Sequence, residues 1–94
     1  DEKMTFKSRH NEFEYNFKTN LLSSPKIMLY NDSILIAIQN KSENLIYLFK
    51  ETGELYTPPF FGNTDFSIGK IKEEKSLNLI VGSFEGLIYN YKIY

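Results

Sequence analysis

The residues that could perform chemistry in this 94-residue sequence are few and widely separated. His10 is the only histidine, and it lies among the polar residues of a predicted turn. Because the chain contains no cysteine, a zinc site would have to combine His10 with three carboxylates. We therefore expect no metal site and no disulfide bond.

The carboxylates do not form the pairs that acid–base catalysis requires. Glu12 and Glu14 share one face of a predicted strand, whereas Glu73 and Glu74 lie together in a predicted turn. Glycoside hydrolases place two carboxyl groups across a cleft, and the sequence shows no such arrangement. The serines have no candidate base beside them. We expect no catalytic residue, no cofactor and no enzymatic activity.

The composition indicates a folded chain without a charged binding surface. The sequence is 41% hydrophobic and 16% aromatic, which favours a packed core over disorder. The net charge is −1, and lysines are scattered among glutamates, so we expect neither nucleic-acid nor membrane-surface binding. No apolar run approaches the roughly 20 residues of a membrane span. The sequence begins with Asp1, and we expect it to be a processed or expressed piece of a longer product.

Short strands separated by turns account for nearly the whole sequence, and helix signals are weak. The clearest period-two pattern is Glu12–Phe17, in which aromatic and polar residues alternate. Near the C-terminus, Gly86 is free to adopt positive φ in a tight turn between two strands. The predicted strands are Met4–Ser8, Glu12–Phe17, Lys26–Leu29, Ile34–Gln39, Leu45–Phe49, Glu54–Thr57, Phe66–Ile71, Leu79–Val81 and Leu87–Ile93. The segment 58–64 is predicted to be an irregular loop.

An internal repeat organises these strands. Residues 24–39 align with residues 68–83 at an offset of 44, which matches Leu35 with Leu79 and Ile36 with Ile80. Residues 45–50, LIYLFK, align with residues 87–92, LIYNYK, at an offset of 42. A period near 43 residues with four short strands per repeat is typical of a β-propeller blade.

The repeat resembles known propeller families. The stretches NLIYLFKETGELY and LNLIVGSFEGLIYNYKI are similar to blades of the pyrroloquinoline-quinone-like type, and TDFSIGKI…LNLIVGS also resembles the FG-GAP type. The calcium loop of FG-GAP blades carries spaced aspartates, whereas Lys72–Ser76 contains none, so we expect no calcium there. The nearest resemblance, over residues 20–94, is to C-terminal repeats of large Bacteroidetes envelope proteins, which implies a periplasmic or cell-envelope location.

The predicted fold class is therefore all-β, with antiparallel propeller-type blades that form a fragment of a larger propeller. Residues 1–19 are the third and fourth strands of a preceding blade, residues 20–63 are a complete blade, and residues 64–94 are a last blade without its fourth strand. Two blades cannot close a core alone, so we expect the remaining blades of a parent chain, a protein partner or a second copy to complete it.

Two groups of residues are candidates for partner binding. The first is the loop around two prolines, where exposed aromatic residues would contact a partner; its residues are Tyr56, Phe60, Phe61 and Asp65. The alternative, in which this loop folds onto the edge of the blade, is favoured over partner binding. The second is edge-strand pairing in a head-to-tail homo-oligomer. There the N-terminal strand of one chain would lie beside the C-terminal strand of the next; the residues are Phe13, Tyr15, Phe17, Tyr89, Tyr91 and Ile93.

These observations favour a non-catalytic binding or scaffolding module. Two alternatives stay open at this point. The chain could be an accessory domain of a larger enzyme, or a small oligomeric carbohydrate-binding module. The absence of tryptophan, which commonly stacks on sugars, counts against the carbohydrate-binding alternative.

Overall fold

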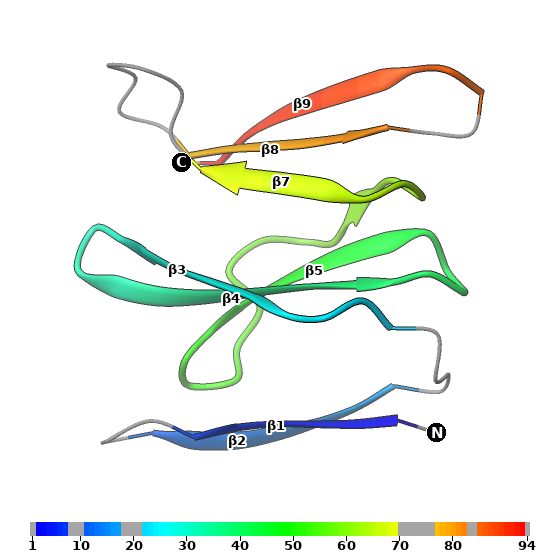
Figure 1. Cartoon of the computed structure of the whole chain (residues 1–94). Coiled ribbons are helices and arrows are strands. Elements are labelled where there is room, and N and C mark those ends of the chain that lie inside the picture. The colour runs from blue at the N-terminus through cyan, green and yellow to red at the C-terminus, as the bar shows by residue number, and fades with distance from the viewer. Residues whose placement is uncertain (1, 8–10, 18–21, 70–76, 83–84, 94) are drawn as a thin grey trace.

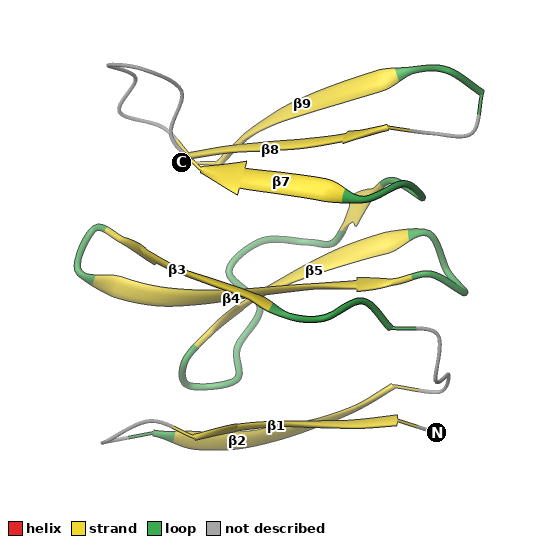
Figure 2. Ribbon diagram, in the orientation of Figure 1, coloured by secondary structure: helices red, strands yellow, loops and turns green. Residues whose placement is uncertain are grey.

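The computed structural model describes residues 2–7, 11–17, 22–69, 77–82 and 85–93. These residues form strands and loops, with no helix among them and hence none able to span a membrane (Figure 2). The nine strands are β1 (Glu2–Lys7), β2 (Glu12–Phe17), β3 (Lys26–Tyr30), β4 (Ser33–Asn40), β5 (Leu45–Lys50), β6 (Phe60–Phe61), β7 (Phe66–Gly69), β8 (Leu77–Gly82) and β9 (Ile88–Ile93). The predicted all-β class with antiparallel pairing is confirmed.

The strands form three antiparallel sheets that are stacked as layers (Figure 1). Strands β1 and β2 form the N-terminal hairpin. The middle sheet has the order β3-β4-β5-β6, and the C-terminal sheet has the order β7-β8-β9. The middle sheet lies between the other two, so each of its faces is covered by a different layer.

Alternation along β4 and β5 creates two separate hydrophobic cores. Successive side chains of a strand point to opposite faces of its sheet. Leu35 and Leu48 therefore belong to the core beneath the C-terminal sheet, whereas Ile36 and Phe49 belong to the core against the hairpin. All four side chains are buried, with exposed fractions of 2% or less. This double burial explains why β4 is a nearly continuous apolar run.

Aromatic rings attach the N-terminal hairpin to the middle sheet. The Tyr15 ring centroid lies 4.9 Å from that of Phe49, and the Phe17 ring meets Tyr47 edge-on at 5.2 Å. Such tilted and edge-on pairs contribute roughly 0.5–1.5 kcal/mol each beyond the burial of their area. The hairpin thus covers β4 and β5 on the face of the middle sheet that lies away from the C-terminal sheet, whereas Ile27 and Leu29 of β3 stay exposed on that face.

The loop between β6 and β7 joins the middle and C-terminal sheets through a buried glutamine. Gln39, 1% exposed, donates from Nε2 to the carbonyl oxygens of Gly62 at 2.9 Å and Thr64 at 2.8 Å. The hydroxyl of Thr64 in turn accepts a hydrogen bond from the backbone N–H of Gly82 at 2.8 Å. One side chain of β4 therefore holds the loop that carries the chain into the next sheet.

Most predicted strands are confirmed within one or two residues, and Glu12–Phe17 is confirmed at both ends. Two predictions in the segment after β5 are wrong. Glu54–Thr57 is not a strand, because only Leu55 makes an isolated bridge, to Phe49. Instead Phe60 and Phe61, predicted to lie in an irregular loop, form β6 and pair with Ile46 and Leu45. The predicted turn Lys72–Ser76 and the ends of two predicted strands, Ser8 and 70–71, lie outside the described residues.

Strand registers also correct the alignment of the repeat. Taking Tyr47 and Tyr89 as equivalent, their partners Ile38 and Val81 are 43 residues apart, which replaces the predicted offset of 44 for the second strand. At an offset of 44, Leu35 and Leu79 would be equivalent, yet these two residues face each other across one core. A shift of one residue reverses the face of every side chain. The offset of 42 between β5 and β9 leaves equivalent residues on equivalent faces.

In the corrected alignment, the middle and C-terminal sheets have the same orientation. Residues Ile36, Ile38, Tyr47 and Phe49 face the hairpin, and their equivalents Leu79, Val81, Tyr89 and Tyr91 face the middle sheet. Each sheet thus directs the same set of positions toward the layer that precedes it in the chain. The ring planes repeat as well, since Tyr47 and Phe49 are stacked at 10° and Tyr89 and Tyr91 at 16°.

We predict that Gly62→Ala destabilises the protein by about 1–3 kcal/mol through overpacking. A Cβ atom at position 62 would lie 2.4 and 2.5 Å from the two methyl carbons of Val81, which is 1% exposed. Gly69→Ala is the matched control, because a Cβ there has no atom within 4 Å. Urea unfolding measures both variants, and equal stabilities of the two variants would contradict the packing described at Gly62.

Candidate functional site

The predicted partner-binding loop does not form a single surface. Tyr56 and Phe60 are half-buried and pack against the core between the middle and C-terminal sheets. Phe61 is 42% exposed, and its ring meets that of Tyr89 edge-on at 5.9 Å. Asp65 is exposed and lines a different depression, together with Lys26. Of these four residues, Phe61 and Asp65 are therefore available to a partner, at separate places.

The six residues predicted for edge pairing direct their side chains into the chain's own cores. Phe13, Tyr15 and Phe17 face the middle sheet from one side, and Tyr89, Tyr91 and Ile93 face it from the other. Tyr91 also donates a hydrogen bond from its hydroxyl to the carbonyl oxygen of Phe61 at 3.0 Å, which ties β9 to β6. Pairing between chains through these strands stays a prediction, and it would involve their backbone edges.

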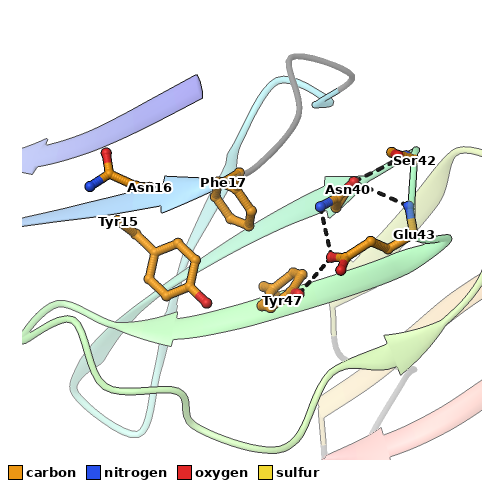
Figure 3. Close-up of a pocket in the computed structure, with 7 residues that line it drawn as sticks. All are labelled: Tyr15, Asn16, Phe17, Asn40, Ser42, Glu43 and Tyr47. Atoms are coloured by element: carbon orange, nitrogen blue, oxygen red, sulfur yellow. Dashed lines mark hydrogen bonds between the residues drawn. The ribbon is translucent and has the colours of Figure 1, made fainter. Parts of the chain in front are cut away.

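A cleft opens where the N-terminal hairpin meets the turn between β4 and β5 (Figure 3). Its volume is about 390 Å³. The hairpin contributes one wall, β5 contributes a second, and the turn closes one end. The described residues that line it are Tyr15, Asn16, Phe17, Asn40, Ser42, Glu43 and Tyr47.

Hydrogen bonds fix the carboxylate of Glu43 at this cleft. The buried Asn40 accepts from the backbone N–H groups of Ser42 at 3.0 Å and Glu43 at 3.2 Å, which sets the turn. Asn40 then donates from Nδ2 to Glu43 Oε1 at 2.8 Å. The hydroxyl of Tyr47 donates to the same oxygen at 2.8 Å (Figure 3). Glu43 is exposed, yet two side chains hold its carboxylate in place.

The hydroxyl of Tyr47 keeps its proton far above neutral pH. Burial, together with the hydrogen bond to the Glu43 carboxylate and its negative charge, raises the pKa of Tyr47 from 10.0 to about 12. Tyr47 therefore acts as a hydrogen-bond donor to Glu43 over the whole physiological range. Burial also raises the pKa of Tyr91.

Sequence reasoning did not single out this cleft. Neither Tyr47 nor any residue of the segment 40–44 is among the predicted partner-binding residues. A signal was present in the sequence: Asn40 followed three residues later by Glu43 is a pattern in which an amide can hold a turn and a carboxylate together. No three histidine, cysteine or acidic residues cluster as a metal site within the described part of the chain.

Comparison with known proteins gives no relative for this chain: no protein family, curated protein or solved structure matches it.

We predict that the free energy of unfolding falls between pH 10 and pH 12, with Tyr47 as one cause. The folded state retains the Tyr47 proton that the unfolded state releases in this range, so the unfolded state is increasingly favoured. Tyr47→Phe has no proton to release there. The free energy of unfolding of the natural protein, measured relative to this variant, should therefore fall from pH 10 to pH 12 in urea titrations. A constant difference would contradict the shifted pKa.

Proposed function

We propose that this protein is a non-catalytic binding or scaffolding module built from propeller-type blades, which binds through the outer face of its C-terminal sheet. The observation that carries the proposal is a difference between the two ends of the stack. The N-terminal end is charged, whereas the C-terminal end exposes aliphatic side chains at positions that are buried in the middle sheet.

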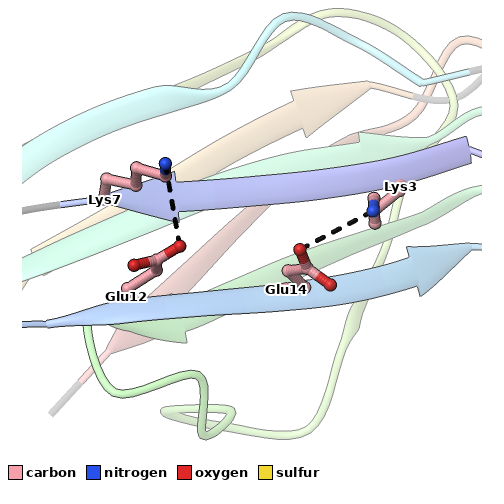
Figure 4. A network of polar contacts seen from close by, with 4 residues as sticks. All are labelled: Lys3, Lys7, Glu12 and Glu14. Atoms are coloured by element: carbon pink, nitrogen blue, oxygen red, sulfur yellow. Dashed lines mark ion pairs between the residues drawn. The ribbon is translucent and has the colours of Figure 1, made fainter.

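The outer face of the N-terminal hairpin is suited to water. Lys3 pairs with Glu14 at 3.6 Å and Lys7 pairs with Glu12 at 3.8 Å, across the two strands (Figure 4). More than half of each of these side chains is exposed. Exposed pairs of this kind contribute about 0–1 kcal/mol, so their main effect is to keep the face polar. A polar outer face is characteristic of the terminal unit of a stacked repeat.

The outer face of the C-terminal sheet differs. Ile88 is 79% exposed, whereas its equivalent in the middle sheet, Ile46, is 0% exposed. Ile80 is 37% exposed, and its equivalent Ala37 is 1% exposed. Asn90 occupies the position that corresponds to Leu48, so the face is mixed. Such a mixture matches interfaces that associate reversibly, which are about as apolar as the rest of a protein surface.

The shared orientation of the middle and C-terminal sheets supports the propeller part of the proposal. Propeller blades are small antiparallel sheets packed face to face, and each blade presents equivalent positions to its neighbour. The middle sheet has the four strands of a complete blade, and the C-terminal sheet follows it in the same orientation. By the same logic, a further sheet would pack on Ile80 and Ile88, supplied by the parent chain or by another protein.

We predict that the isolated chain self-associates through this face at tens of micromolar. In the absence of another protein, a second copy is the partner whose sheet can cover Ile80 and Ile88. The double variant Ile80→Lys/Ile88→Lys should be an 11.0 kDa monomer by light scattering. The double variant Ile27→Lys/Leu29→Lys is the control, since it changes two exposed residues of β3, 62% and 69% exposed, away from the proposed face.

Two outcomes would contradict this proposal. A natural chain that stays monomeric at tens of micromolar would show that the exposed isoleucines do not drive association. Association that survives in Ile80→Lys/Ile88→Lys would indicate the predicted pairing of strand edges instead.

A further inference from the structure

We propose that the cleft beside Glu43 binds a primary ammonium or guanidinium group, as presented by a basic side chain of a protein partner. This site lies at the hairpin side of the middle sheet, away from Ile80 and Ile88. The proposal for this cleft can therefore be tested independently of binding at the C-terminal face.

The carboxylate of Glu43 is positioned before any ligand arrives. The hydrogen bonds from Asn40 and Tyr47 both end on Oε1 of Glu43. Within the described residues, Oε2 accepts no hydrogen bond. Asn40 is 2% exposed and is itself held by two backbone donors of the turn. A ligand cation thus meets a carboxylate whose orientation is already fixed, which reduces the entropy lost on binding.

The hydrogen-bonding groups of the cleft favour a ligand that donates. Donors from Asn40 and Tyr47 are directed at Glu43. Oε2 of Glu43 and the oxygen of Tyr47 remain as acceptors. An ammonium carries three donors and no acceptor, and a guanidinium carries five. Tyr15, Asn16 and Ser42 also line the cleft and carry groups that both donate and accept, so the preference for a cation over a sugar hydroxyl rests on the charge of Glu43.

The charge of Glu43 and the aromatic rings at the cleft both favour the binding of a cation. Glu43 is the one charged residue among the described residues that line the cleft, so the field there is negative. The half-buried rings of Tyr15 and Tyr47 lie 6.0 Å apart at the wall. Aromatic rings attract cations through their faces and also cover the methylene groups of a lysine or arginine side chain.

The test is a titration monitored by NMR of the full chain, following the ring signals of Tyr15 and Tyr47 and the side-chain amide of Asn40. The probes are n-butylammonium, a lysine blocked at both its amino and carboxyl groups, and a blocked arginine. We expect saturable shifts at millimolar concentrations, with the blocked amino acids binding at least as tightly as the amine. n-Butanol and methyl glucoside are neutral probes and should give no saturable shifts.

Glu43→Gln separates charge from shape, because it keeps an oxygen that accepts from Asn40 and Tyr47. This variant should weaken cation binding by about tenfold, the loss of one charge-assisted hydrogen bond. Glu54→Gln, an exposed carboxylate on the loop after β5, is the matched control and should bind as the natural protein does. An unchanged amide spectrum away from the cleft shows that each variant is folded.

Three results would overturn the whole proposal, and a fourth would overturn the part that concerns a protein partner. The first is the absence of saturable shifts with any cation. The second is equal binding by Glu43→Gln and the natural protein. The third is binding of methyl glucoside in preference to the cations, which would identify a polyhydroxyl site instead. Binding of n-butylammonium without the blocked lysine would overturn the protein-partner source and leave a small-amine site.

Discussion

Burial of both faces of β4 and β5 is the constraint on which the rest of the structure depends. A two-sided apolar sheet cannot persist in water unless a separate layer covers each face. The N-terminal hairpin and the C-terminal sheet meet that need from opposite sides. Each fully buried aliphatic or aromatic side chain contributes about 1.5–3 kcal/mol to folding, so loss of either layer would expose a costly surface. The three layers therefore form one cooperative unit.

This arrangement places polar groups at the borders between layers, where they must find partners. Gln39 follows the apolar run of β4, and its amide satisfies two carbonyl oxygens of the loop that leads to β7. Lys26 reaches from β3 to the carbonyl oxygen of Phe66 and lies 4.5 Å from the centre of its ring. Both contacts join consecutive sheets through side chains, since no strand pairing connects the sheets within the described part of the chain.

The sequence carried enough information to predict the strands and little of what lies between them. Alternation identified Glu12–Phe17, and the turn glycine Gly86 does adopt positive φ, at 87°. Strand β6 could not be foreseen, because two residues have no periodicity and their pairing with β5 depends on a loop that passes over the core. The offset of the repeat was misjudged by one residue for the second strand, since adjacent leucines and isoleucines are interchangeable by type and are separated only by the face they occupy.

The cleft illustrates the same limit. Its residues come from β2, the end of β4, β5 and the turn between β4 and β5. Only packing of the hairpin on the middle sheet brings Tyr15 to the same place as Glu43. Local sequence could indicate the turn between Asn40 and Asn44 but not the wall that faces it. The aromatic residues of the hairpin were predicted to lie beside the C-terminal strand of a neighbouring copy, because their alternation does not specify the layer against which they pack.

The charge pairs on the hairpin would also limit the size of any assembly formed by the proposed association. A stack with adhesive surfaces at both ends would add copies without limit, as fibres do, because each addition regenerates a new adhesive end. Here Lys3, Lys7, Glu12 and Glu14 cover one end with hydrated charge. If copies associate through the C-terminal sheet as proposed, contact through that end would join two copies in a two-fold arrangement, and the pair would present its charged hairpin faces in both directions. The hairpin covers the core, and in such an assembly it would also stop the addition of further copies.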